Sequence, residues 1–179
     1  GTFSQQKFTP VFVDGPVVVL ENKDVLPRVK LYYQATPSAS LEDALNLLQY
    51  GQDFRNQIIL ETNRVNRYVE DKSDRVKIDK YTATKVDIQA KTKNGAYLFL
   101  SDNNYPGWKA TINGQEAPII TAFGVFRAVQ IPAGEARVSF TYRPESFYHG
   151  LYISLFSLLA LLTIVWLSNE KNKHHNQKS

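Results

Sequence analysis

The residues best suited to ligand chemistry lie in one short segment, from residue 100 to residue 110. This segment combines one carboxylate, two neighbouring amides and two aromatic rings within a few positions. Carboxylates and amides hydrogen-bond to hydroxyl groups, and aromatic rings stack on the faces of sugars, so the combination is typical of a glycan-binding surface. With an arginine further along the chain, the candidate glycan-contacting residues are Asp102, Asn104, Tyr105, Trp108 and Arg127.

A purely structural interpretation of the same residues is favoured by their turn chemistry. Asp102 can cap a turn, residues 106–107 can form its corner as a Pro-Gly pair, and Trp108 can begin the next strand with its ring in the core. Arg127 is then an ion-pair partner for Asp102 or Glu116. The sequence leaves both interpretations open.

No catalytic constellation can be assembled from the chain's reactive side chains. Cysteine is absent, which excludes thiolate nucleophiles and zinc sites built on thiolates. The histidines are His149, His174 and His175, and all three lie outside the region expected to form β-structure. No glycine-rich phosphate loop follows a strand. We therefore expect no catalytic residue, no metal ion and no cofactor.

The charge pattern argues against a nucleic-acid partner. The net charge of +4 is small for 179 residues, and the basic residues are scattered among acidic ones. Binding to a phosphate backbone needs lysine and arginine clustered on one face. We expect a solvated, mildly basic surface instead.

The strongest signal for a single element is the apolar segment of residues 150–167. With the aromatic residues before it, the segment reaches the roughly 20 residues that cross a hydrocarbon core of about 30 Å. It is apolar on every face, unlike an amphipathic helix, and aromatic residues such as Tyr148 and Trp166 mark both ends. We expect a transmembrane helix over residues 147–168 and a polar tail over residues 169–179.

The region before this helix divides into a short α/β part and a longer β part. Residues 1–62 show a strand, strand, helix, strand pattern, with a helix that begins after the N-cap Ser40 and ends near Gly51. Residues 63–74 are polar without an apolar period, which predicts a linker or exposed loop. Residues 75–146 are expected to form the main β domain.

Seven short alternating runs within residues 75–146 predict an Ig-like or jelly-roll-like β-sandwich. Asn-Gly pairs at residues 94–95 and 113–114 supply the positive φ of tight hairpins, and residues 132–135 predict another reversal. The expected fold class is mainly β, of the α+β type, with a sandwich after a small strand-strand-helix-strand subdomain and before one transmembrane helix. The runs are residues 76–81, 85–91, 96–100, 108–112, 117–120, 126–131 and 137–142.

Several short motifs occur together and in a fixed order. They are LEN at residues 20–22, LPR at 26–28, LFLS at 98–101, DNNYPGWKA at 102–110, FRAV at 126–129, IPAG at 131–134 and FTYRP at 140–144. In these motifs the chain resembles the C-terminal region of the YfhO-like bacterial membrane proteins. The resemblance implies a polytopic protein similar to the lipid-linked-sugar glycosyltransferases and associated with sugar decoration of cell-wall polymers such as lipoteichoic acid. It also implies that the catalytic acid lies in an early loop, outside this chain.

The resemblance implies a role as the non-catalytic extracytoplasmic C-terminal domain and last membrane helix of such a protein. The β domain would lie outside the bacterial cell membrane, and the tail would be cytoplasmic. The sequence begins at Gly1 and contains no methionine, so we expect the tail of a longer protein. The expected partners are the lipid bilayer, preceding transmembrane helices, and a cell-wall glycan or polyprenyl-linked sugar. The alternatives are a membrane-anchored glycan-binding module and a purely structural outer domain.

Overall fold

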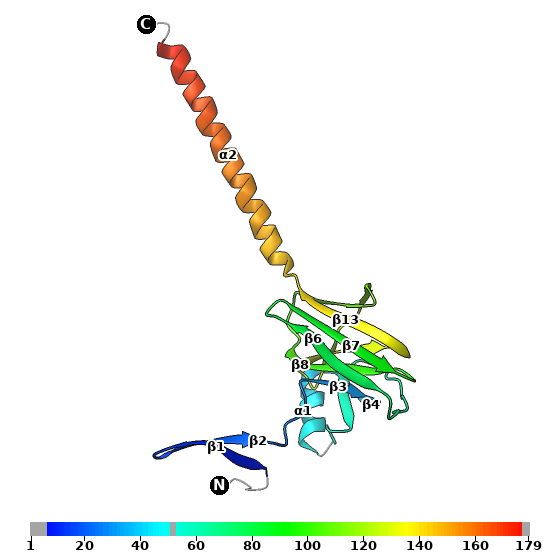
Figure 1. Ribbon diagram of the computed structural model, residues 1–179. Helices are drawn as coiled ribbons and strands as arrows, with labels where there is room; N and C mark the ends of the chain where they lie inside the picture. The colour runs from blue at the N-terminus through cyan, green and yellow to red at the C-terminus, as the bar shows by residue number, and fades with distance from the viewer. Residues whose placement is uncertain (1–6, 51–52, 177–179) are drawn as a thin grey trace.

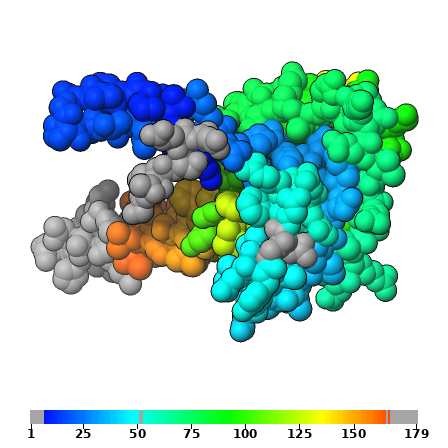
Figure 2. All heavy atoms as spheres, turned by 90° about the horizontal axis from the view of Figure 1, so that it is seen from below, coloured from blue at the N-terminus to red at the C-terminus, as the bar shows by residue number. Residues whose placement is uncertain are grey.

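The computed structural model describes residues 7–50 and 53–176 (Figure 1). Within these ranges, thirteen strands form three sheets and two helices complete the fold. The mainly β fold class predicted from the sequence is confirmed. Two of the sheets stack as a sandwich, and the third is a hairpin formed by β1 (Phe8–Asp14) and β2 (Val17–Asn22). Figure 2 shows this hairpin as an arm that stands out from the sandwich.

The five-stranded sheet of the sandwich is antiparallel and has the order β10-β9-β13-β7-β6. Its strands alternate between buried and outward-facing residues, as a sheet covered on one face should. In β7, for example, Val86 and Ile88 are buried and Gln89 is exposed. The bounds are β6 (Arg75–Tyr81), β7 (Lys85–Thr92), β9 (Trp108–Ile112), β10 (Gln115–Ala117) and β13 (Gly134–Tyr142).

The six-stranded sheet has the order β3-β8-β12-β11-β5-β4 and is covered on both faces. Its β4 and β5 are parallel and are connected through the helix α1 (Leu41–Gln49), because parallel strands need a crossover. The bounds are β3 (Val29–Tyr32), β4 (Gln34–Ser38), β5 (Gln57–Glu61), β8 (Ala96–Asn103), β11 (Ile120–Ala122) and β12 (Phe126–Ile131).

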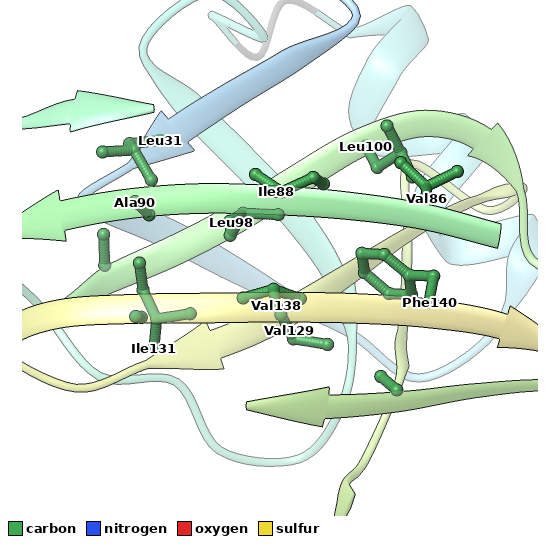
Figure 3. Close-up of a cluster of buried hydrophobic side chains, with 13 residues drawn as sticks. Leu31, Val86, Ile88, Ala90, Leu98, Leu100, Val129, Ile131, Val138 and Phe140 are labelled. Atoms are coloured by element: carbon green, nitrogen blue, oxygen red, sulfur yellow. The ribbon is translucent and has the colours of Figure 1, made fainter. Parts of the chain in front are cut away.

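Two hydrophobic clusters hold the layers together. The first lies between the two sheets, where Val138 and Phe140 of β13 pack in one cluster with Leu98 and Leu100 of β8 (Figure 3). The second lies on the other face of the six-stranded sheet and combines aliphatic residues with several aromatic rings, and it is called the aromatic cluster below. There Tyr32 and Phe123 each make an edge-to-face contact with Phe99, at centroid distances of 5.8 and 5.5 Å. Such ring pairs add about 0.5–1.5 kcal/mol beyond the burial of their area.

The strand order differs from the division predicted at residues 63–74. Strands β3, β4 and β5 pair within the same sheet as β8, β11 and β12, so residues 29–61 are part of the sandwich and not a separate subdomain. Residues 63–74 form an irregular loop, as predicted, but this loop packs on the sheet. The Tyr68 ring lies 5.4 Å from that of Tyr97, and the Tyr68 N–H donates to the Tyr33 carbonyl at 2.9 Å.

Most of the predicted local signals are present. Asn113 and Gly114 both have positive φ, at 52° and 84°, as a tight hairpin requires. The Ser40 hydroxyl caps α1 by accepting from the Asp43 N–H at 3.2 Å, while Gly51 lies outside the described residues. The run at residues 117–120 is not one strand, because the chain passes there from β10 in one sheet to β11 in the other. Pro118, which lacks an N–H, lies in this crossing.

The helix α2 (Glu145–Asn176) follows β13 after two residues and projects away from the sandwich (Figure 1). Its segment Glu145–Ile164 is long and apolar enough to cross a membrane, with a mean hydropathy of 1.7. The sandwich covers none of this segment in the part of the chain that the structure describes. The predicted apolar helix is therefore present, and it begins two residues earlier than expected.

The shared sheet predicts which fragments fold. A fragment of residues 75–143 exposes one whole face of β8 and lacks β3, β4 and β5, so we expect no cooperative unfolding transition. A fragment of residues 25–143 retains both clusters and lacks the apolar helix, so it should fold and stay soluble without detergent. Circular dichroism during heating shows whether each fragment unfolds in a cooperative transition. A cooperative transition in the shorter fragment would contradict the shared-sheet interpretation.

The second cluster predicts a loss of stability at alkaline pH. Burial raises the pKa of Tyr32 to about 12 and also raises the pKa of Tyr97, and both residues belong to this cluster. Unfolding therefore releases protons above about pH 10, where free tyrosine ionises, and stability should fall from there to about pH 12. Between about pH 10 and pH 12, the melting temperature of Tyr32→Phe should decrease less than that of the wild type. The control Tyr50→Phe, at an exposed position, should lose as much as the wild type does. Superimposable profiles for Tyr32→Phe and the wild type would refute this account.

Candidate functional site

The candidate residues come from strand ends that meet at one end of the sandwich. In β13, Tyr142 pairs with Trp108 at the start of β9, and Thr141 pairs with Lys85 at the start of β7. In the other sheet, Phe126 at the start of β12 pairs with Asn103 at the end of β8. Since β13 leads into α2, this end of the sandwich is the one from which the apolar helix leaves.

A bulge in β8 positions Asp102 for its partners. The register of β8 against β12 shifts between Phe126 and Arg127, so Ser101 and Asp102 have no residue directly opposite them. A bulge of this kind re-aims side chains at the end of a strand. The Ser101 N–H donates instead to the Arg28 carbonyl at 2.8 Å, which brings Arg28 beside Asp102.

Asp102 accepts interactions from three side chains. Tyr81 donates its hydroxyl hydrogen toward both carboxylate oxygens, at 3.1 and 3.0 Å. Arg127 Nη2 lies 3.3 Å from Oδ2, and Arg28 Nη1 lies 3.7 Å from Oδ1. The carboxylate is therefore held by one hydroxyl and two cations, and only 13% of its side chain is exposed.

Arg127 is a buried cation that lies against an aromatic ring. The residue is 2% exposed, and its guanidinium carbon lies 3.7 Å from the centre of the Trp108 ring and 5.4 Å from that of Phe140. Its Nε and Nη1 have no hydrogen-bond partner among the residues that the structure describes. The charge therefore depends on the Trp108 face and on Asp102, because an uncompensated buried cation is costly.

The electrostatics of the site follow from burial. Burial lowers the pKa of the Arg127 guanidinium, and the neighbouring Asp102 opposes this effect. An arginine remains protonated in proteins, so the cation persists. Burial also raises the pKa of Tyr81, and its hydrogen bond to Asp102 raises it further. At neutral pH the Tyr81 hydroxyl therefore remains a donor to the carboxylate.

Two open pockets flank the aromatic loop of residues 104–107 and share Tyr105 and Trp108 in their walls. One has a volume of about 480 Å³ and includes Tyr81, Asp102 and Arg127, and the other has a volume of about 460 Å³ and includes Lys109 and Glu116. Both volumes fall in the range of small-molecule sites. Carboxylate, guanidinium and ring faces together suit a ligand with hydroxyl groups and an apolar face.

The five predicted glycan-contacting residues take different positions in this site. Arg127 contacts both Trp108 and Asp102, and Asp102 is one of its two predicted partners. Tyr105 lies at the rim and is 66% exposed. Asn104 fastens the loop, because its side-chain amide donates to Thr121 Oγ1 at 3.0 Å and its backbone N–H donates to the Val125 carbonyl at 2.7 Å.

Tyr81 and Arg28 were not predicted from the sequence. Tyr81 lies 21 residues before Asp102, at the end of a strand whose pattern gave no functional signal. Arg28 stands within the LPR motif, yet nothing in that motif indicates a partner in β8. Both residues reach Asp102 only through the pairing of strands that are distant in sequence.

The aromatic loop is fastened to the start of α2. The Arg143 N–H donates to the Gly107 carbonyl at 2.7 Å, and Lys109 Nζ lies 3.4 Å from Glu145 Oε1. Gly107 has a φ of 102°, and a Cβ there would lie 2.9 Å from the Tyr142 ring and 3.1 Å from Pro144 Cα. Only glycine fits this close approach.

The sandwich and its projecting apolar helix define a membrane-associated β domain. The family model for the bacterial membrane protein YfhO matches residues 58–154, which is more than half of the chain. The chain therefore belongs to the YfhO family of bacterial membrane proteins, as the sequence motifs indicated. The matched region includes all five candidate site residues and the start of α2. No curated protein and no solved structure matches the chain.

The buried ion pair predicts strong coupling between Asp102 and Arg127. Asp102→Asn leaves a buried cation without its anion, so it should lower the free energy of unfolding by about 2–4 kcal/mol. The double variant Asp102→Asn/Arg127→Met should recover much of this loss. Asp79→Asn, which removes an exposed pair with Lys77, should cost less than about 1 kcal/mol. Urea unfolding of residues 25–143 measures all three, and additive losses in the double variant would contradict the coupling.

Proposed function

We propose that this chain is the non-catalytic extracytoplasmic domain and last membrane helix of a larger YfhO-family protein, and that it holds a glycan at the membrane surface. One observation carries the proposal. The pocket formed by Asp102, Tyr105 and Trp108 opens at the end of the sandwich from which α2 leaves. A helix that crosses the bilayer places this pocket beside the lipid headgroups, where a lipid-linked sugar or a membrane-bound polymer lies.

The chemistry of the pocket fits a sugar ligand. A pyranose ring can stack on the exposed Tyr105 ring at the rim, while its hydroxyl groups donate to Asp102. Arg127 covers part of the Trp108 ring, so Tyr105 offers the freer aromatic face of the two. Because Tyr81 and the two arginines already hold the carboxylate in place, it is preorganised to accept a ligand hydroxyl.

Within the parent protein the domain would assist a glycosyltransferase-like reaction whose catalytic residues lie elsewhere. Its contribution would be to hold a cell-wall acceptor such as lipoteichoic acid, or the polyprenyl-linked sugar, close to the reacting groups. Preceding transmembrane helices would pack beside α2, with the β domain outside and the tail in the cytoplasm. Membership of a bacterial membrane protein family supports this arrangement.

A membrane-anchored glycan-binding module would use the same pocket without an attached enzyme. A purely structural outer domain is the second alternative, and a specific observation favours it. Asp102 and Asn104 both have partners within the fold, so each has a structural role that needs no ligand. Measuring whether the chain binds a glycan distinguishes a glycan-binding domain from a purely structural one.

Glycan binding is expected to depend on Tyr105 without a change in stability. The purified full chain in detergent micelles is titrated with soluble fragments of glycosylated wall polymer, and binding is followed by calorimetry. Tyr105→Ala should weaken binding by about tenfold, which corresponds to about 1.4 kcal/mol, and leave the melting temperature unchanged. Trp108→Ala should lose binding and also lower stability by roughly 3 kcal/mol, because its ring packs on Arg127 and Tyr142.

The matched control is Tyr50→Ala, an 82% exposed tyrosine at the end of α1, which should bind as the wild type does. No binding by the wild-type chain, or equal binding by Tyr105→Ala, would favour the purely structural domain.

A further inference from the structure

The aromatic loop of residues 104–107 lies close to the level at which α2 would enter the bilayer. Its Gly107 is hydrogen-bonded to Arg143, two residues before α2 begins. The membrane-crossing segment starts at Glu145, and its first aromatic residues are Phe147 and Tyr148. Phe147 lies four residues after Arg143, and four helical residues rise about 6 Å, so the loop and these aromatic residues are separated by roughly one helical turn along the membrane normal.

The exposed side chains at this end of the sandwich match the chemistry of a headgroup layer. Tyr105 is 66% exposed and carries an amphipathic ring of the type found at membrane interfaces. Lys109, with 54% of its side chain exposed, and the exposed Arg143 supply cations for lipid phosphates. Of the nearby carboxylates, Asp102 is held by two arginines, Glu145 forms only an exposed pair with Lys109 at 3.4 Å, which water screens, and Glu116 lies in the wall of the same pocket as Lys109.

We propose that this end of the sandwich rests on the phospholipid surface, with Tyr105 in the headgroup layer and Lys109 and Arg143 directed toward lipid phosphates. The contact surface continues the one that α2 makes with the bilayer. It shares Tyr105 with the proposed glycan site but needs no bound glycan, because Lys109 and Arg143 lie outside the pocket that contains Asp102. Its effect is to fix the orientation of the domain, so that both pockets open along the membrane surface.

Site-specific fluorescence can test this contact, because the natural chain has no cysteine. A single cysteine is introduced by Tyr105→Cys, Phe147→Cys or Ala133→Cys and labelled with an environment-sensitive dye. Each full-length variant is reconstituted into nanodiscs of mixed zwitterionic and anionic phospholipids, with and without a lipid that carries a quencher at headgroup level. Residue 133 is the far-end control, because it precedes β13 and lies about 30 Å from Tyr142 along that strand.

The dye at residue 105 should be quenched nearly as strongly as the dye at residue 147, and the dye at residue 133 should not be quenched. Pro106→Cys, at a second exposed position in the loop, should behave as Tyr105→Cys does, and melting curves verify that each variant is folded. If residues 105 and 106 behave like residue 133 while residue 147 is quenched, the domain stands away from the surface and the proposal fails. An unquenched dye at residue 147 would also overturn it, because α2 would then not enter the bilayer there.

Discussion

Strand β8 has five consecutive buried residues, from 96 to 100, so both of its faces must be covered. Leu98 and Leu100 point into the cluster between the sheets, and Tyr97 and Phe99 point into the aromatic cluster behind them. Each fully buried side chain of this size contributes about 1.5–3 kcal/mol relative to exposure. A single additional sheet cannot cover both faces, so the fold needs the five-stranded sheet on one side and α1 with the loop of residues 62–74 on the other.

The double coverage of β8 also explains the chemistry at its end. Where the apolar run stops, the bulge at Ser101 and Asp102 releases the strand from its register with β12. Arg127 enters the edge of the core at this point, and its charge is compensated by Asp102 and by the face of Trp108. The Asp102–Arg127 pair therefore lies at the boundary between the packed interior and the open pocket. A buried pair of this kind costs desolvation energy, so it is poor evidence for stability alone.

Local signals in the sequence predicted much of the architecture. The apolar segment of residues 150–167, the Asn-Gly hairpin at residues 113–114 and the cap at Ser40 each depend on interactions within a few residues. Most strands of the sandwich were predicted to within a few residues, because alternation is also a local pattern. The run at residues 117–120 was wrong, and β4 was not predicted. The hairpin strand β1 was not predicted, since Pro10 interrupts its pattern and coincides with an irregularity in its pairing.

Pairing between distant strands was not accessible from one sequence. The polar composition of residues 63–74 indicated a boundary, yet β3 pairs with β8 across that stretch. Asp102 and Arg127 were recognised as possible partners because their residue types are complementary, but Tyr81 and Arg28 meet them only through the register of two sheets. Propensity does not encode which strand lies beside which. A single sequence therefore does not reveal which distant strands pair, and this information is needed to place Tyr81 and Arg28 beside Asp102.

Continuity between β13 and α2 links the interior of the fold to the apolar helix. Strand β13 pairs with β7 along nearly its whole length and with β9 from Val138 to Tyr142, and only two residues separate its last residue from the helix. The close approach of Gly107 to Tyr142 and Pro144 limits how far the helix can swing relative to the aromatic loop, because a shift would break the Arg143 hydrogen bond and the Trp108–Tyr142 ring contact. The position of the pocket relative to α2 is thus set by strand register and by this close approach, and not by a flexible linker.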